Sequence, residues 1–179
     1  MTNKEIAELG VSLVSKLLGL SELIVLYRPA SDFSSDEVNA MFIKTRYFIV
    51  FKIDWIETAE HLDILTSAFH ETRHAYQMAQ VEFPEGFKYN EPEEVLDRWE
   101  NEFKNYKASP DTSEEHDMQY LDQDIELDAI AFEHYLAMRL FKVDLEPHEY
   151  AEERVREKRK SFKTIYDDVV IEKLRFEKD

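Results

Sequence analysis

The sequence predicts an α+β fold, in which a small N-terminal sheet of about three strands packs against helices. Runs rich in β-branched and aromatic residues are confined to residues 22–54, whereas apolar residues recur at helical spacing before and after them. The chain has 179 residues and a hydrophobic share of 44%, which is enough to bury one core. We therefore expect a single domain over residues 1–179.

The N-terminal third should form one helix and then the sheet. Apolar residues at helical spacing, from Ile6 to Leu17, predict a helix that ends near Gly19. Strands are predicted over residues 22–27, 39–44 and 46–54. In the third strand, every second residue from Tyr47 to Ile53 is apolar, whereas the alternate positions end in Lys52 and Asp54. One face should be core and the other partly solvated.

Two helices should follow the sheet. Residues 57–80 contain no Gly or Pro and carry an apolar stripe, so they predict one long helix, which Pro84 and Gly86 end. Pro92 should occupy the first turn of the next helix. Its predicted core residues are Val95, Trp99, Phe103 and Tyr106.

The C-terminal third should also be helical. Thr112 and Glu115 offer a capping box, and one apolar stripe then runs from Leu121 to Leu140. The segment after Pro147 mixes charges of both signs, which is typical of a helix with a solvated face. These patterns complete the helical part of the predicted fold.

The charge and composition exclude several classes of function. The formal net charge of −17 repels phosphate backbones and anionic lipid surfaces, so no direct nucleic-acid or membrane partner is expected. The N-terminus lacks the pattern of a secretion signal, and the apolar runs are too short to span a bilayer, so we expect a cytoplasmic protein. Because the chain has no cysteine, any metal must be held by His, Asp or Glu. The oligomeric state stays open.

The stretch HETRH, residues 70–74, has the spacing of a metal site. On a helix His70 and His74 stand one turn apart on the same face, and Glu71 lies beside an ion that they would share. From there a carboxylate can take a proton from water at the metal. A shuffled chain of this composition would contain roughly 0.03 such strings, so a lone match is only suggestive, and its position in the middle of a predicted helix strengthens it.

A catalytic zinc site requires a third protein ligand and an open position for water. The segment from Tyr120 to Leu140 is the place to search, because it puts five acids in a helix that otherwise has the pattern of core. The third-ligand candidates by residue type are His116, His134, Asp122, Glu126, Asp128 and Glu133. Residue reasoning alone leaves all six open.

HETRH followed by ELDAIAF some fifty residues later resembles the zincin metallopeptidases of the gluzincin kind. Among these, the motifs and the order of elements are most similar to the ImmA/IrrE-type peptidases. The resemblance implies a zincin-like fold, Zn²⁺ held by His70, His74 and Glu126, Glu71 as general base, and hydrolysis of peptide bonds in a protein or peptide substrate.

The resemblance covers roughly residues 40–140, and the sequence departs from it at one position. Gluzincins often carry an Asp four residues after the ligand Glu, where it supports a histidine, and here that residue is Ile130. Asp128 inside the motif is the preferred replacement, ahead of Asp122. Gln77 lies on the histidine face of the helix without an assigned role.

An oxyanion formed during hydrolysis would require a further donor, for which Tyr89, His116 and Tyr120 are candidates by type. Two other classes of function compete with the peptidase. The first is an interaction protein that keeps the zincin fold and binds a regulator without cleaving it, although binding alone does not need Glu71. The second is an acidic helical adaptor in which HETRH is accidental.

Overall fold

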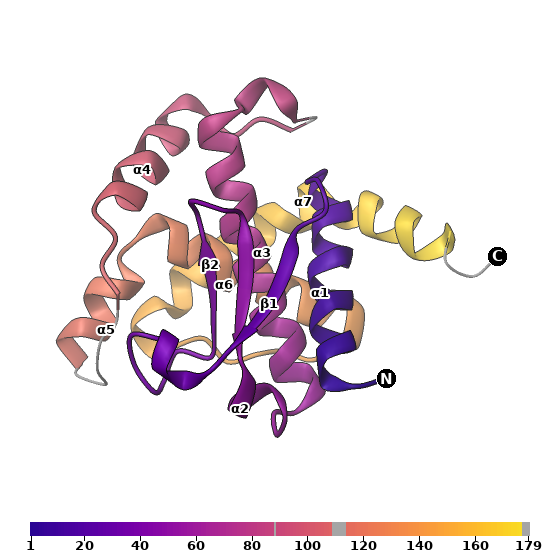
Figure 1. Cartoon of the computed structure of the whole chain (residues 1–179). Helices are drawn as coiled ribbons and strands as arrows, with labels where there is room; N and C mark the ends of the chain where they lie inside the picture. Colours follow the sequence, from indigo (N-terminus) through magenta and orange to yellow (C-terminus); the bar gives the residue numbers. More distant parts are fainter. Residues whose placement is uncertain (88, 109–113, 177–179) are drawn as a thin grey trace.

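The computed structural model describes residues 1–87, 89–108 and 114–176, with side chains described through residue 167 except at 114–116. In this part of the chain, seven α-helices accompany a three-stranded sheet. Figure 1 shows how these elements are arranged. The predicted α+β class is confirmed.

The sheet consists of β1 (Ile24–Arg28), β2 (Ala40–Ile43) and β3 (Phe48–Lys52), in the order β1-β3-β2. The central strand β3 pairs parallel with β1 and antiparallel with β2. All three predicted strands are present, and each is shorter than predicted. Because β2 lies at the edge, one side of it is not paired within the sheet.

Helix α1 (Asn3–Leu18) begins at a capping box between Thr2 and Glu5 and ends at Gly19, whose φ of 75° suits glycine. It packs along α3 (His61–Glu82). At Gly10 the two helices approach so closely that an added Cβ would lie 2.8 Å from the Cβ of Ala68. Glycine is therefore required at the crossing.

The predicted helix over residues 57–80 begins later than expected. Strand β3 ends at Lys52, and residues Ile53–Ile56 form a short helix α2, which buries Ile56 completely. The prediction of strand up to Asp54 was therefore wrong, because the chain turns to bury Ile56. Helix α3 then begins at His61 and ends at Glu82, just before the 3₁₀ turn η2 (Pro84–Gly86).

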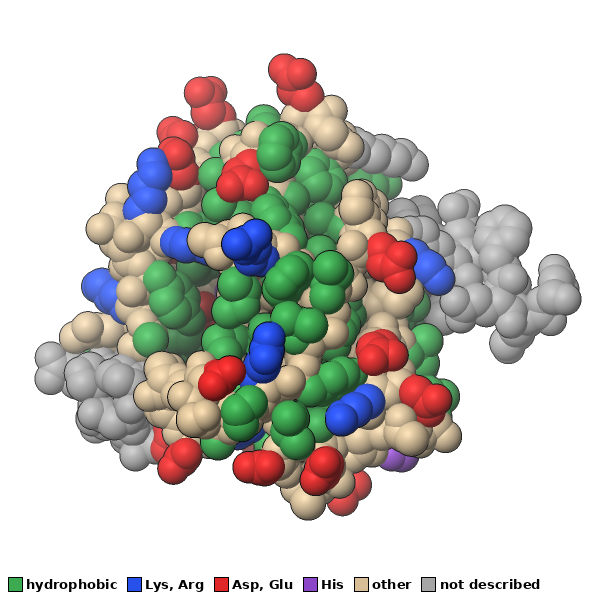
Figure 2. All heavy atoms as spheres, in the orientation of Figure 1, with side chains coloured by type: hydrophobic (Ala, Val, Ile, Leu, Met, Phe, Trp, Pro, Cys, Tyr) green, Lys and Arg blue, Asp and Glu red, His purple; other side chains and the backbone are tan. Residues whose placement is uncertain are grey.

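The second face of β3 is less solvated than predicted. Lys52 is only 6% exposed, since its Nζ donates to the backbone oxygen of Asp36 at 2.5 Å and lies 5.8 Å from the ring centre of Phe33. The loop after β1, with its 3₁₀ turn η1 (Ala30–Asp32), covers this end of the strand. Figure 2 shows apolar side chains gathered over the sheet on this side of the molecule.

The helices after α3 are α4 (Glu93–Lys104), α5 (Glu114–Leu121), α6 (Asp124–Leu136) and α7 (Glu152–Phe176). A π-helix, η3 (Ala137–Phe141), follows α6 directly, and a 3₁₀ turn, η4 (Glu149–Ala151), precedes α7. Pro92 is the N-cap of α4 and does not enter its first turn. Thr112, from the predicted capping box, lies outside the described residues.

The predicted stripe from Leu121 to Leu140 is not one α-helix. Leu121 ends α5, and α6 starts at Asp124, where the carboxylate of Glu102 accepts hydrogen bonds from the backbone N–H groups of Asp124 and Ile125 at 3.0 and 2.9 Å. The side chain of Gln123 bonds both backbone groups of Lys107, each at 2.8 Å. These contacts from a distant segment stabilise the break.

Helix α3 lies at the centre, behind the sheet in Figure 1, with α6 packed against it. One cluster of buried side chains joins α1, the sheet and α3, and another joins α3, α6 and α7. In α7 the expected apolar residue Phe162 is buried, whereas Ile165 is 37% exposed. None of the helices described has the length and apolar character that crossing a bilayer requires.

Candidate metal centre

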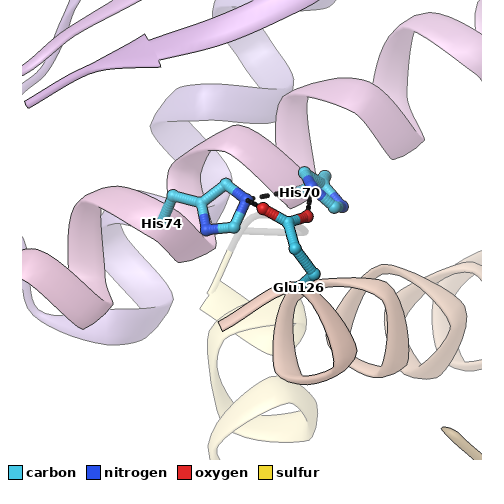
Figure 3. Close-up of side chains that lie close together, drawn as sticks. All are labelled: His70, His74 and Glu126. Atoms are coloured by element: carbon cyan, nitrogen blue, oxygen red, sulfur yellow. Dashed lines mark hydrogen bonds and ion pairs between the residues drawn. The ribbon is translucent and has the colours of Figure 1, made fainter. Parts of the chain in front are cut away.

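Helices α3 and α6 bring His70, His74 and Glu126 together. The two histidines stand one turn apart near the middle of α3, and Glu126 lies in the first turn of α6. One potential ligand atom from each residue lies within 4.8 Å of the others. Figure 3 shows the Glu126 carboxylate reaching from α6 toward both imidazoles.

The facing atoms converge on one point. The Nε2 atoms of the two histidines are 3.0 Å apart, and each lies near a different oxygen of Glu126, at 3.3 Å for His70 and 3.4 Å for His74. Glu126 is fully buried, and the close contacts of its two oxygens are the ion-pair contacts with these two imidazoles. A buried carboxylate of this kind is costly unless it is paired or coordinates a metal, so the donor set fits a cation.

The three groups perturb one another strongly. Burial by itself raises the pKa of Glu126, but the neighbouring His74 and His70 hold it far below its ordinary value. Burial lowers the pKa of His70, but hydrogen bonds to Glu126 and Glu133 raise it well above its ordinary value. Without a metal the site therefore favours protons on its histidines, and a metal must compete with them.

Gln77 fixes the tautomer of His74. The amide nitrogen of Gln77 donates to Ile125 O and to Asp128 Oδ2, each at 2.9 Å, so its oxygen must face the imidazole. That oxygen lies 2.8 Å from His74 Nδ1, which must then carry the hydrogen. In the neutral imidazole, the form that binds a metal, the lone pair is therefore on Nε2, the nitrogen that faces Glu126. This is the role that the sequence did not assign to Gln77.

His70 has a carboxylate partner of its own. Its Nδ1 lies 3.2 Å from Glu133 Oε2. Glu133 therefore holds the hydrogen of this imidazole on Nδ1, as Gln77 does for His74. The sequence suggested Glu133 only as a possible ligand. Its position seven residues after Glu126, two turns along the same helix face, was the signal that could have indicated a supporting role.

Replacing Glu133 with alanine should weaken zinc binding by about tenfold to a hundredfold, because His70 would lose the acceptor that orients it. Competition with a chromogenic chelator measures this affinity. Glu133→Gln keeps an acceptor oxygen and should recover part of the loss, whereas Glu100→Ala, at an exposed position of α4, should have no effect. Equal affinities for Glu133→Ala and wild type would rule out the supporting role.

Asp128, the predicted second carboxylate, reaches His74 through Gln77 and not directly. Its main partner is the fully buried Arg73, which it binds through both oxygens, at 2.6 Å to Nε and 3.2 Å to Nη2. Burial raises its pKa, but the charges of Arg73 and Lys158 leave the pKa of Asp128 below its ordinary value. Asp128 therefore fixes the side chain of Gln77, which in turn orients the imidazole of His74.

Arg73, which lies inside HETRH, connects Asp128 to helix α7. Its guanidinium donates to Tyr166 Oη at 3.1 Å, and its carbon lies 4.9 and 5.0 Å from the ring centres of Phe132 and Phe162. Lys158 of α7 also contacts Asp128, at 3.1 Å. A bidentate pair stacked among aromatic rings holds α3, α6 and α7 in register.

Asp128→Asn should lower the free energy of unfolding by about 3–5 kcal/mol, because it leaves the buried charge of Arg73 without its main partner. Urea denaturation followed by circular dichroism measures the change. As a matched control, Glu100→Gln breaks the exposed pair with Lys104 and should cost less than about 1 kcal/mol. If the two variants were equally stable, the Arg73–Asp128 pair would not be a major support of the fold.

The other third-ligand candidates lie elsewhere. Asp122 is on the surface, where its Oδ1 accepts from Tyr150 at 2.7 Å and from Arg154 at 3.1 Å. His134 is buried beside Glu133 and is not one of the three converging residues. The side chain of His116 is outside the described residues. The geometry therefore selects Glu126 from the described candidates, and its function as a ligand stays a prediction.

His70, His74 and Glu126 line a cavity of about 670 Å³, whose wall also includes residues of β2. Glu71 lines the same cavity. Burial raises its pKa above the ordinary value, His70 and His74 oppose that rise, and a backbone hydrogen bond from Phe42 of β2 also lowers it. A raised pKa brings a carboxylate closer to the range in which it can accept and return a proton.

Two tyrosines complete the cavity wall. Tyr120, a predicted donor, lies there together with Tyr106, which the sequence assigned to the core of α4. Tyr106 follows the end of α4 and is 48% exposed. Partial burial and the charge of Glu126 raise the pKa of both phenols, which stay protonated donors. Tyr89 does not line the cavity, and its ring packs against that of Tyr166.

Comparisons with known proteins found no family model, curated protein or solved structure that matches the chain. The function of the site therefore has to be inferred from the chemistry of its own residues.

Proposed function

We propose that this protein is a zinc-dependent metallopeptidase. The observation that carries the proposal is the convergence of His70, His74 and the buried carboxylate of Glu126 in a cavity that Glu71 also lines. Two imidazoles and one carboxylate, with a fourth position open to a cavity, form the donor set of catalytic zinc. The same set occurs in the gluzincins that the sequence resembles.

Zinc held there would act as a Lewis acid that polarises a carbonyl and lowers the pKa of water. Glu71 accepts the proton of the attacking water at its carboxylate and returns it to the leaving nitrogen of the peptide. A ligand set alone would not need this extra, partly buried carboxylate, which favours catalysis over a purely structural metal.

Tyr120 and Tyr106 supply neutral hydroxyl donors on the cavity wall. A peptide carbonyl under attack develops negative charge on its oxygen, and a positioned phenol can donate a hydrogen bond to that oxygen. Because both phenols keep their protons, neither competes with the substrate for the metal as an anion.

The edge of β2 that no described strand pairs with favours an extended peptide as the substrate. Residues 40–43 of this strand line the cavity, and β2 lies at the border of the sheet. An extended chain can add to such an edge through backbone hydrogen bonds, which makes recognition largely independent of side chains. The acidic chain attracts basic or neutral segments more readily than acidic ones.

Cleavage of a mixed library of unstructured peptides, followed by mass spectrometry, tests the proposal. The zinc-loaded protein should cleave peptides, chelation should stop cleavage, and added zinc should restore it. A zinc-loaded protein that cleaves neither the library nor an unfolded protein would favour the alternative, a zincin-fold protein that binds a regulator without cutting it.

A further inference from the structure

A second cavity, of about 540 Å³, lies where α6, η3 and α7 meet. Its wall is strongly basic, although the whole chain has a net charge of −17. The six cationic residues are Arg139, Lys142, Arg156, Arg159, Lys160 and Lys163. Only two acids, Asp144 and Asp167, line the same cavity.

Both acids are engaged with arginines. Asp144 Oδ1 lies 2.8 Å from Arg159 Nη1, and Asp167 Oδ1 lies 3.2 Å from Arg139 Nε. The hydroxyl of Tyr135 also donates to Asp167, at 3.0 Å. These contacts hold two partly buried guanidinium groups in place at the wall, where they can still donate through their other N–H groups.

Apart from Arg139 and Arg159, four more cationic residues line the cavity, and no further acid among the described residues lines it. Arg156 has an exposed partner in Glu152, at 2.7 Å. Lys160 and Lys163 stand three residues apart on α7, so they lie on one helix face, and both are exposed at the cavity. With Lys142 they form a positive rim whose charge the lining acids do not balance.

The backbone at this wall is also unusual. Residues Ala137–Phe141 form the π-helix η3, and Lys142 follows in a left-handed conformation with φ 62°. A π-helix is rare, and a left-handed non-glycine residue costs energy, so such features are typical of functional sites. Here they place Arg139 and Lys142 on the same cavity wall.

We infer that this second cavity binds a small molecule carrying phosphate groups. Its volume is within the range of small-molecule sites, and paired guanidinium and ammonium groups are the usual donors to phosphate oxygens. A nucleic acid is disfavoured, because its long backbone would extend beyond the basic wall over an acidic protein. No residue of this wall lines the metal cavity, so the inference is independent of the proposed peptidase activity.

Isothermal titration of the full chain with pyrophosphate and with ATP tests the inference. At least one of them should bind, at about one molecule per chain, and binding should weaken as salt is added. Pyrophosphate tests the phosphate chemistry alone, whereas ATP adds a base and a sugar. Tighter binding of ATP would identify a nucleotide-like ligand, and equal binding would identify the phosphates as the recognised part.

The double variant Lys160→Gln/Lys163→Gln should weaken this binding at least about tenfold, since each lost charge-assisted contact is expected to matter. Both lysines are exposed, so circular dichroism should be unchanged. The control Lys4→Gln/Lys104→Gln removes the same charge from α1 and α4 and should leave the affinity within about twofold.

Three results would overturn the inference. The first is no binding of either compound at low salt. The second is equal weakening in both double variants, which would indicate a general field effect and not a site. The third is a single-stranded oligonucleotide that binds more tightly than ATP, which would make the wall a nucleic-acid surface.

Discussion

Glu126→Ala is expected to abolish zinc binding, reducing the metal content from about one ion per chain to almost none. Glu126 is the only one of the three converging residues that comes from α6, and both its oxygens face the histidines. Two imidazoles four residues apart do not hold zinc in a catalytic geometry without a third protein ligand.

Plasma mass spectrometry of protein purified without chelator or nickel resin measures the metal content. Asp122→Asn is the matched control, because Asp122 was a candidate ligand by sequence and lies on the surface. It should retain the wild-type zinc content. A wild type without metal after zinc is supplied would refute the site. Iron in place of zinc would refute the peptidase proposal, because two histidines and one carboxylate also bind Fe(II).

Glu71→Gln should lower kcat for peptide cleavage by about a hundredfold to ten-thousandfold while the zinc content stays at the wild-type level. The amide has nearly the shape of the carboxylate but cannot accept a proton from water at neutral pH. Because Glu71 is not one of the three converging residues, metal affinity should change little. Initial rates over a range of peptide concentrations separate kcat from KM.

Glu91→Gln is a suitable control for Glu71→Gln, since Glu91 is a partly buried acid that pairs with Arg73 and does not line the metal cavity. Its kcat should stay within a few-fold of wild type. Full activity in Glu71→Gln would exclude Glu71 as the base. If a biological effect of the protein survived in Glu71→Gln with zinc retained, the interaction-protein alternative would replace the peptidase.

The site could be predicted from the sequence only in part. The i, i+4 spacing of His70 and His74 is a local property of a helix, so it could be recognised without a fold. Glu126 came from a resemblance between motifs, because residue reasoning alone left six candidates open. The supporting residues Glu133 and Gln77 were not assigned their roles, since their partners depend on how α3 and α6 pack.

Tyr106 shows why local pattern was insufficient. Its spacing from Trp99 and Phe103 matched a core stripe, yet α4 ends at Lys104 and Tyr106 lines the cavity of the candidate metal centre. The end of a helix depends on competing contacts beyond it, which periodicity does not contain.

The sequence by itself determined the α+β class, the three strands, the helical placement of HETRH and the absence of thiolate ligands. These features depend on side-chain periodicity, on turn residues and on composition, all of which act over short stretches of chain. The tertiary structure alone decided the break between α5 and α6, where Glu102 binds two N–H groups of α6 just before Glu126. It also decided the Arg73–Asp128 pair and the basic second cavity. Each of these joins residues far apart in sequence, and such contacts form only after the core has packed.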